Sequence, residues 1–288
     1  MSPLLVANGL HKSYPQGRSL WGRARPAQSV VRDVSFHVDR GETLGIVGET
    51  GAGKSTVGRM VLRLVEADSG HVSFDGTDLS TLSPASLRRM RQRMTMIFQD
   101  PFNSLDPRMT LRAAVREPLT LHTSLGGAEK EARVRELLER VGMRQDHLDR
   151  YPREFSGGQL QRIAIARALA ADPDFIVCDE PVAALDLSIQ AQVLNLLLDL
   201  QQERGLSYLF ISHDLSLVRF LAHRVAVMSQ GVIVEQGTPE EVFTDPKHPY
   251  TRALVSAIPT PRPTRVSRWP AGFPAPGPSR PATERRSR

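Results

Sequence analysis

GETGAGKST, residues 48–56, is the stretch that decides the fold of this chain. It lies between the apolar run TLGIV at 43–47 and a segment whose apolar residues at 57, 60, 61 and 64 recur at helical spacing, which predicts a helix there. Strand, glycine-rich turn and helix in this order give the GxxxxGK[ST] pattern the context in which it binds nucleotide phosphates. A glycine-rich surface turn is the alternative, but it accounts for neither the complete pattern nor both flanking elements.

Each part of this loop has a physical role in holding phosphate. Glycines adopt backbone angles that are closed to other residues, so N–H groups can wrap the phosphate oxygens. The helix that begins there adds unpaired N–H groups and the positive end of its dipole. We expect Lys54 to meet the outer phosphates and the Ser55 hydroxyl to hold Mg²⁺. The expected nucleotide ligands are Gly48, Glu49, Thr50, Gly51, Ala52, Gly53, Lys54, Ser55 and Thr56.

Strand and helix patterns alternate along the rest of the chain. Strands are expected at 4–10, 30–38, 43–47, 70–74, 94–98, 175–178, 207–211, 224–228 and 231–235, and helices at 128–141, 158–170, 188–203 and 215–221. This alternation predicts the α/β class, with a P-loop NTPase core built on a mostly parallel sheet. An antiparallel β region is expected near the N-terminus, where Asp75-Gly76 is a strong turn signal.

The expected domain boundaries follow from changes in this pattern. One nucleotide-binding domain is expected over residues 1–258, with a helical subdomain inserted at about 100–170. Thr238 and Pro239 open a short helix, which begins a helical extension over about 238–258. Residues 259–281 hold eight prolines, so the segment 259–288 is predicted to be a disordered tail.

Composition limits the class of protein and its location. Hydrophobic residues make up 40% of the chain and charged residues 24%, as in soluble proteins. No apolar run approaches the roughly 18 residues that a transmembrane helix needs. Cys178, the single cysteine, excludes an internal disulfide and indicates a reducing compartment. We therefore expect a cytosolic protein.

The net charge of +6 has a local origin. Residues 262–288 contain seven Arg and one Glu, which accounts for the whole excess. A basic tail can contact anionic lipid or RNA, but it is more often a solvated end. No specific nucleic acid partner is therefore predicted.

Two further stretches carry chemistry. The apolar strand at 175–178 ends in Asp179 and Glu180, at the sheet edge where α/β proteins bind ligands. Asp179 can coordinate Mg²⁺ and Glu180 can polarise an attacking water. Ser156, Gly157, Gly158 and Gln159 open a helix and form a second anion cradle from N–H groups. Alone, the first could be a strand meeting solvent and the second a well-capped helix.

With these motifs in this order, the chain resembles the nucleotide-binding subunits of ATP-binding cassette (ABC) transporters over about residues 4–258. FSGGQLQR at 155–162 is similar to the signature motif of that family. The resemblance implies a head-to-tail dimer with two ATP molecules, each held between the phosphate loop of one subunit and Ser156, Gly157, Gly158 and Gln159 of the other. The second cradle would then serve the partner's ATP.

Other positions match the family singly, and their roles are implied by that match. Tyr14 matches the aromatic residue that stacks on adenine, and Gln99 the glutamine that joins Mg²⁺ and water to the helical subdomain. Asp186 matches an aspartate that contacts the partner's phosphate loop. His213 matches the switch histidine at the γ-phosphate, although a lone histidine after a strand is usually structural. The implied catalytic group is Glu180, His213 and Gln99, and the implied magnesium ligands are Ser55, Gln99 and Asp179.

Local segments indicate a subgroup. DPFNSLDP at 100–107, YPREF at 151–155 and HPYTRAL at 248–254 resemble the oligopeptide and dipeptide importers, a branch that includes nickel importers. The loop at 15–28 is typical of the second ATPase of such systems. The implied function is ATP hydrolysis that powers uptake of peptides, of nickel or of another small solute.

The resemblance also implies partners. These are a second ABC ATPase subunit, identical or paralogous, two transmembrane permease subunits and, indirectly, an external solute-binding protein. The expected location is the cytoplasmic face of the plasma membrane. Two alternatives remain: a soluble ABC ATPase acting on nucleic acid or the ribosome, and a regulatory module that binds ATP without hydrolysing it.

Overall fold

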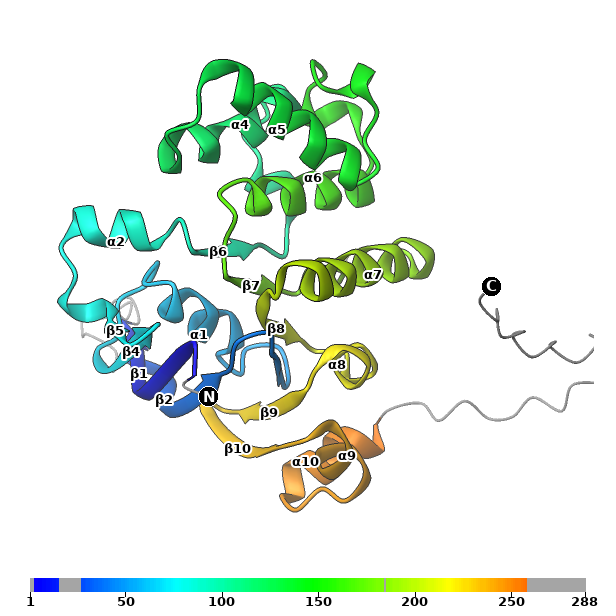
Figure 1. Ribbon diagram of the computed structural model, residues 1–288. Coiled ribbons are helices and arrows are strands. Elements are labelled where there is room, and N and C mark those ends of the chain that lie inside the picture. The colour runs from blue at the N-terminus through cyan, green and yellow to red at the C-terminus, as the bar shows by residue number, and fades with distance from the viewer. Residues whose placement is uncertain (1–2, 16–26, 184, 258–288) are drawn as a thin grey trace, which may run out of the picture.

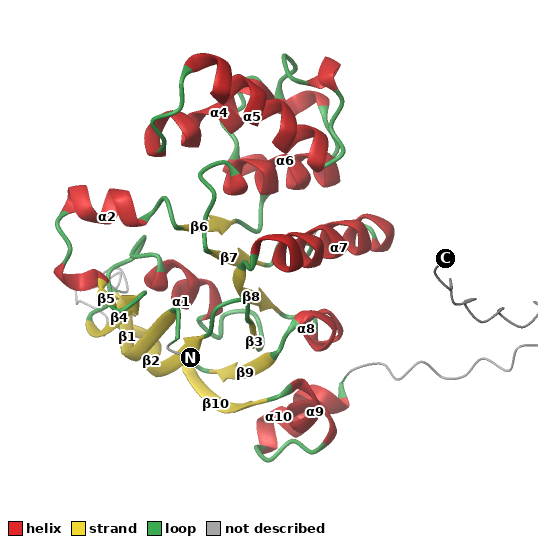
Figure 2. Ribbon diagram, in the orientation of Figure 1, coloured by secondary structure: helices red, strands yellow, loops and turns green. Residues whose placement is uncertain are grey.

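The chain folds around two β-sheets, as the ribbon in Figure 2 shows. The computed structural model describes residues 3–15, 27–183 and 185–257, so most of the loop at 15–28 and the tail at 259–288 lie outside the described residues. A four-stranded antiparallel sheet has the order β2-β1-β4-β5, and a six-stranded sheet has the order β10-β9-β3-β8-β7-β6. All neighbours in the larger sheet pair in parallel except β10 with β9. The predicted α/β class with an antiparallel N-terminal region is therefore confirmed.

The strands lie close to the predicted ranges. Their bounds are β1 Leu5–Tyr14, β2 Gln28–Val38, β3 Thr43–Val47, β4 Ser69–Phe74, β5 Thr77–Asp78, β6 Met94–Ile97, β7 Phe175–Asp179, β8 Ser207–Ser212, β9 Arg224–Ser229 and β10 Val232–Gly237. The helices are α1 Lys54–Val61, α2 Pro84–Met90, α3 Pro101–Ser104, α4 Leu111–His122, α5 Gly127–Arg140, α6 Gly157–Leu169, α7 Leu187–Arg204, α8 Leu215–Leu221, α9 Pro239–Thr244 and α10 Pro249–Ser256. The Asp75-Gly76 signal is the turn of the β4–β5 hairpin.

The parallel strands are apolar on both faces because helices cover both. Along β8, Leu209 and Ile211 join the core cluster that contains α1, whereas Tyr208 and Phe210 join the cluster on the opposite face. The first cluster fills the space between the two sheets, and α1 lies within it (Figure 1). Helix α1 is apolar on two sides because it packs between the two sheets. This packing positions its first turn at the end of β3.

One detail of the predicted helix was wrong. The apolar spacing from Val57 included Leu64, but α1 ends at Val61 and the Leu64 side chain is 45% exposed. The chain turns there because Arg63 adopts a left-handed backbone with φ 51°. Positive φ is uncommon outside glycine and is incompatible with a continuing right-handed helix.

Helices α3 to α6 form a separate layer above the edge strand β6 (Figure 1). The chain leaves the sheet after β6 and returns to it through α6 into β7. The apolar faces of these helices meet one another, as Leu111, Leu137 and Leu160 are fully buried in one cluster. None of the helices in the described residues is both long and apolar enough to cross a membrane.

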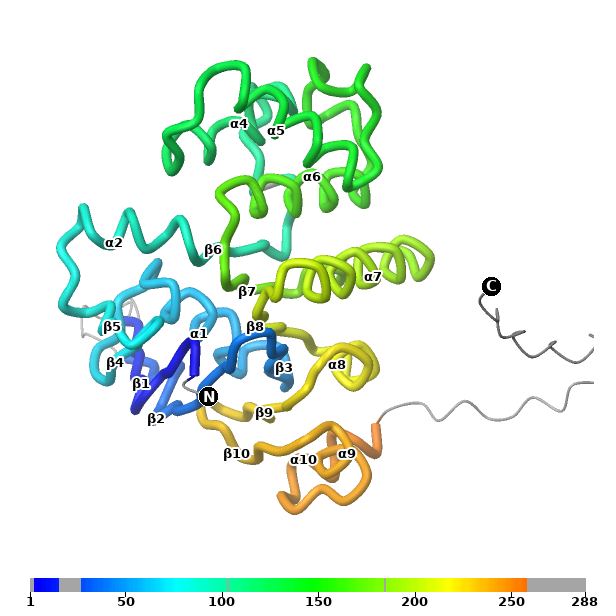
Figure 3. The backbone as a smooth tube through the Cα atoms, in the orientation of Figure 1, coloured from blue at the N-terminus to red at the C-terminus, as the bar shows by residue number. Residues whose placement is uncertain are grey.

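The chain ends, in its described part, with α9 and α10 folded against β10 (Figure 3). The Thr238 hydroxyl caps α9 by accepting the Glu241 N–H, and the Glu241 carboxylate in turn accepts the Thr238 N–H at 2.8 Å. The loop before α10 is fastened to β10, because the Glu235 carboxylate accepts the N–H groups of Lys247 at 2.7 Å and His248 at 3.0 Å. Glu235 is therefore the anchor of α10.

Replacing Glu235 by Gln should loosen α10 in a pH-dependent manner. Burial acts to raise the pKa of Glu235, but hydrogen bonds, including those from Lys247 and His248, lower it below its usual value. A lowered pKa adds stability above the unfolded pKa and loses it as pH falls through the folded one. Glu235→Gln should cost about 1 kcal/mol of unfolding free energy at neutral pH. The cost should vanish in acid, where the wild-type carboxyl group is protonated. Urea unfolding at neutral and at acid pH measures the difference in unfolding free energy, and a variant that loses as much stability in acid as at neutral pH would contradict this role.

Candidate functional site

The expected nucleotide site lies where four parallel strands end. Residues directly after β3, β6, β7 and β8 supply the phosphate loop, Gln99, Glu180 and His213. Because the carboxyl ends of parallel strands meet at one edge, these groups surround a common hollow of about 510 Å³. Its lining consists of Val30, Thr50, Gly51, Gly53, Lys54, Ser55, Thr56, Gln99, Glu180, Ala183 and His213. The structure thus brings together residues up to 183 positions apart in the sequence.

Two glycines allow the loop to enter this space. Gly48 has φ 153°, and a Cβ atom there would lie 2.0 Å from the carbonyl oxygen of Met228 on β9. Gly53 has φ 101°, and its Cβ would lie 2.5 Å from the carbonyl oxygen of Val30 on β2. Both contacts are with backbone, which cannot move aside, so no other residue fits at either position. The loop is therefore held between the two sheets.

Lys54 is the buried cation of the loop. It is only 4% exposed, and its Nζ donates to the carbonyl oxygens of Gly48 at 2.7 Å and Glu49 at 2.9 Å. Burial lowers the pKa of Lys54, against the opposing effects of Glu180, Asp179 and Glu49. The ammonium group faces the hollow, and within the described residues these two bonds leave the third of its N–H donors for a ligand.

Ser55 and Asp179 form the second polar pair. The Ser55 hydroxyl donates to Asp179 Oδ1 at 2.7 Å, and Asp179 is 2% exposed. Burial raises the pKa of Asp179, against the lowering effect of the Ser55 hydrogen bond and of Arg59. A hydroxyl and a carboxylate are hard oxygen donors, which Mg²⁺ prefers. These two side chains therefore fit the magnesium ion that the sequence predicts, together with an oxygen of Gln99.

Glu180 is the centre of a third group. Its Oε2 accepts from Gln99 Nε2 at 2.9 Å and lies 3.2 Å from His213 Nδ1. The residue has a left-handed backbone, with φ 48°, and its N–H donates to the Ile211 carbonyl oxygen at 2.9 Å. This conformation is uncommon for a residue with a Cβ and is found where the structure requires a side chain to face one way. It turns the Glu180 carboxylate into the hollow beside Lys54.

Other predicted site residues lie away from the hollow of this chain. Tyr14 is the last residue of β1, where it pairs with Gln28. It is 39% exposed, and the Lys12 ammonium group lies over its ring. Asp186 caps α7 by accepting the Ile189 N–H at 3.0 Å. That hydrogen bond, with another from Ser188, lowers the pKa of Asp186. Neither Tyr14 nor Asp186 lines the hollow.

The signature segment begins α6 and also lies outside the hollow. Ser156 caps the helix, accepting the Gln159 N–H at 3.4 Å, while Gln159 Oε1 accepts the Ser156 N–H at 3.0 Å. A Cβ on Gly158 would lie 2.6 Å from Ile189 of α7, so this glycine is needed for packing. A Cβ on Gly157 would meet nothing nearer than 3.8 Å, so the fold itself leaves space there.

Two contacts of the loop were missed by sequence reasoning. Val30, a β2 residue, lines the hollow through a strand whose pattern indicated only core packing. The Tyr250 hydroxyl accepts the Glu49 N–H at 3.2 Å, across 201 positions of sequence. No periodicity could indicate that contact, although HPYTRAL was already notable as a segment.

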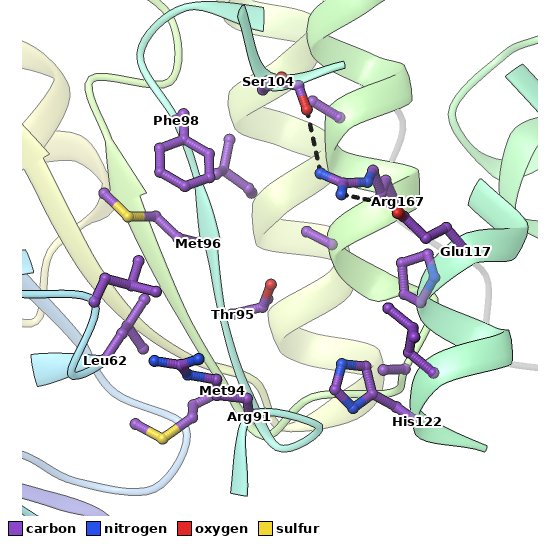
Figure 4. Close-up of a pocket in the computed structure, with 17 residues that line it drawn as sticks. Leu62, Arg91, Met94, Thr95, Met96, Phe98, Ser104, Glu117, His122 and Arg167 are labelled. Carbon is purple, nitrogen blue, oxygen red and sulfur yellow. Dashed lines mark hydrogen bonds and ion pairs between the residues drawn. The ribbon is translucent and has the colours of Figure 1, made fainter. Parts of the chain in front are cut away.

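A second hollow, of about 230 Å³, lies between β6 and the helical layer (Figure 4). The strand side presents Met96 and Phe98, whereas the helix side presents Glu117, His122 and Arg167. Arg167 donates to Glu117 at 2.9 Å and to the Ser104 carbonyl oxygen at 3.2 Å. These bonds tie α6 to α4 and to the segment that follows Gln99.

The family models decide the relationship. Residues 31–183 match the "ABC transporter" model, and residues 234–275 match the "Oligopeptide/dipeptide transporter, C-terminal region" model.

The chain belongs to the ABC transporter family.

Relatives of this ABC protein are import ATP-binding proteins by name. A Brucella ovis protein, provisionally named a peptide import ATP-binding protein, is 53% identical over 91% of the chain and 80% of its own length. The glutathione import ATP-binding protein GsiA of Escherichia coli K12 is 51% identical over 91% of the chain. The chain spans only 42% of the length of GsiA. The predicted resemblance to this branch is thereby confirmed.

Solved cassettes share the fold. The ABC protein superposes with TM-score 0.73 on the dimeric ATP-binding cassette MJ0796 bound to ADP and Pi, at 27% identity, covering 82% of this chain and 98% of that one. It matches cbiO1 of Clostridium perfringens, part of the transporter complex cbiONQ, with TM-score 0.72 at 27% identity. That match covers 85% of this chain and 92% of the other.

Asp179→Asn should stabilise the nucleotide-free protein while weakening its response to Mg²⁺ and ATP. Burial raises the pKa of Asp179 in the folded protein above its value in the unfolded chain. The charged carboxylate therefore destabilises the fold, an effect that is absent below the unfolded pKa, grows as pH rises toward the folded pKa and is complete above it. The amide keeps an acceptor for Ser55 but carries no charge. We expect a Tm about 2–4 °C higher at neutral pH, and a smaller difference in acid. Thermal unfolding with and without Mg²⁺ and ATP measures both effects; a lower Tm without nucleotide would contradict them.

Proposed function

We propose that this chain is the ATP-hydrolysing subunit of an importer for peptides, with nickel or another small solute as the alternative cargo. One observation carries the enzymatic part of the proposal. Lys54, Ser55, Gln99, Glu180 and His213 line a single hollow at the carboxyl edge of a parallel sheet. A regulatory module that only binds ATP has no need for a carboxylate held by an amide and an imidazole.

In the proposed reaction, ATP enters this hollow with its phosphates on the loop. Lys54 and the loop N–H groups hold the outer phosphates and offset their charge. Glu180 accepts a proton from the attacking water, whose oxygen bonds to the γ-phosphorus as the bond to the ADP oxygen breaks. Gln99 and His213 hold the Glu180 carboxylate, and His213 meets the γ-phosphate. Mg²⁺ bound to Ser55 and Asp179 would polarise the phosphate oxygens.

The proposed site is complete only in a pair of cassettes. Ser156, Gly157 and Gly158 do not line the hollow of their own chain, yet they form a second N–H cradle at the start of α6. A second cassette would bring its cradle onto the γ-phosphate, and Asp186 would approach the partner's loop. An identical copy supplies that half in the purified protein; a paralogue with the same motifs supplies it in a mixed pair. The dimeric MJ0796 cassette, which binds ADP and Pi, supports this arrangement.

The remaining proposed contacts are with the membrane subunits. Two permeases would dock on the helical layer, near the segment from Gln99 to Pro107, so that movement at Gln99 reaches them. The hollow beside β6 supports this position, because it borders the same segment and Leu121, 63% exposed, lines it. The chain would then be peripheral, on the cytoplasmic face of the plasma membrane. The relatives' names support peptides as cargo, delivered by an external solute-binding protein.

Membrane fractionation together with an ATPase assay tests this function. The purified chain should hydrolyse ATP with Mg²⁺, and the chain should sediment with membranes only when the neighbouring permease genes are expressed. Absence of hydrolysis would favour the regulatory module. Hydrolysis stimulated by nucleic acid or ribosomes, with no permease-dependent sedimentation, would instead support a soluble ABC ATPase.

A further inference from the structure

A hydrogen bond joins the C-terminal extension to the phosphate loop. Tyr250, the second residue of α10, directs its hydroxyl to the Glu49 N–H at a distance of 3.2 Å. The extension lies beyond β10, on the side of the sheet away from the helical layer (Figure 1). The contact therefore joins the last described helix to the nucleotide loop without passing through the groups proposed to react.

That N–H belongs to a peptide group held at both ends. The carbonyl oxygen of the same peptide unit, that of Gly48, accepts from Lys54 Nζ at 2.7 Å. A peptide group next to glycine is free to rotate, because Gly48 has no Cβ to restrict its neighbours. The Tyr250 hydroxyl removes this freedom by holding the N–H side. The carbonyl side then faces Lys54, and the ammonium group is fixed toward the hollow.

Tyr250 is itself firmly placed. Its ring is half-buried and packs, with Leu254 and Val255, against the core cluster to which the buried residues of α8 belong. The turn before it is fixed by the Glu235 carboxylate, and the His248 imidazole accepts the Tyr250 N–H at 3.2 Å. A hydroxyl on such a support can orient the peptide group that it contacts, whereas a hydroxyl on a mobile side chain would follow that group.

We propose that Tyr250 is a positioning residue for the nucleotide site, so that docking of α10 and binding of ATP favour each other. The inference rests on the proposed function in that it takes ATP as the ligand of the loop. Coupling between two binding events is reciprocal, so ATP must stabilise the docked α10 by the same factor by which docked α10 strengthens ATP binding. Docking of the C-terminal extension then raises nucleotide affinity, and displacing the extension would weaken ATP binding.

Tyr250→Phe tests the proposal, because it removes the hydroxyl and keeps the packed ring. Removing one neutral hydrogen bond should weaken ATP binding about three- to tenfold by calorimetry. Without nucleotide, exchange of the Glu49 amide with solvent should become faster. Adding ATP should protect the amides of α10 in the wild type, and this protection should be lost in the variant.

Tyr208→Phe is the matched control. Its hydroxyl also bonds to the backbone, here as a donor to the Leu197 carbonyl oxygen at 2.9 Å, but Tyr208 pairs with Thr43 at the opposite end of β3 from the loop. This variant should lower the Tm and leave ATP affinity unchanged. Glu235→Gln, which loosens α10 by another route, should weaken ATP binding as Tyr250→Phe does.

The outcomes separate the two proposals. ATP affinity and α10 protection of Tyr250→Phe equal to those of the wild type would overturn the positioning role while leaving the proposed function intact. A wild-type chain that binds no ATP would overturn the proposed function and this coupling with it. Equal losses of affinity in the Tyr208 and Tyr250 variants would show a general effect of stability, which also contradicts the positioning role.

Discussion

Glu180→Gln should lower ATP turnover by about 10²–10⁴-fold, the usual effect of removing a general base. The amide cannot take a proton from water, yet it keeps the size of the side chain and an acceptor for the Gln99 amide, 2.9 Å away in the wild type. ATP binding should therefore persist, and the protein should accumulate as an ATP-bound dimer. Phosphate release and light scattering on the same sample measure the two effects.

A matched variant separates this effect from a change in net charge. Glu66 is 79% exposed and lies outside the lining of the hollow, so Glu66→Gln makes the same chemical change at the surface. Its turnover should equal that of the wild type. Normal turnover in Glu180→Gln would remove Glu180 from the role of base.

Lys54→Ala should weaken ATP binding by about 10²-fold, because charged hydrogen bonds to phosphate are lost and nothing replaces the buried ammonium group. The change also frees the carbonyl oxygens of Gly48 and Glu49, which Lys54 holds together. The loop should then bind ATP more weakly for two reasons: it lacks the positive charge of Lys54, and its backbone is held less firmly. Calorimetry with ATP and Mg²⁺ measures the affinity, and hydrolysis should fall in parallel.

Arg144→Ala is the control for this variant, since its side chain is 76% exposed and pairs with Asp146. It removes a positive charge without touching the loop, so its ATP affinity should be unchanged. Wild-type affinity in Lys54→Ala would mean that the phosphates lie elsewhere than on this loop.

The strand ends explain why much of the site could be predicted. The loop, Asp179 and Glu180 each follow an apolar run, and parallel strands deliver such positions to one edge. Gln99 and His213 also follow strands, but their roles came from the family resemblance. A single polar residue after a strand does not by itself indicate a catalytic or binding role. Their shared approach to Glu180 is visible only in three dimensions.

Other features were beyond the reach of sequence patterns for physical reasons. Helix α1 ends at Val61 because the backbone turns left-handed at Arg63, and residue spacing does not encode that angle. The contact of Tyr250 with Glu49 depends on how α10 folds back over the sheet, a tertiary arrangement with no local signal. Gly157 and Gly158 look alike in the sequence, yet only Gly158 is needed for packing against Ile189.

This difference between the two glycines permits a test of whether each ATP site combines two chains, as we propose. Gly157→Glu should leave the fold intact, since its Cβ meets nothing nearer than 3.8 Å, but its carboxylate would repel the partner's γ-phosphate. Lys54→Ala damages the other half of the site. Each variant alone should be inactive, because every site in a homodimer then carries one damaged half.

Mixing the two variants is the decisive measurement. A mixed dimer holds one site with both halves damaged and one site with Lys54 from one chain and Gly157 from the other, both intact. The mixture should regain ATP turnover well above the sum of the separate variants. A mixture that stays at that sum, or a Gly157→Glu protein that hydrolyses ATP at the wild-type rate by itself, would contradict it.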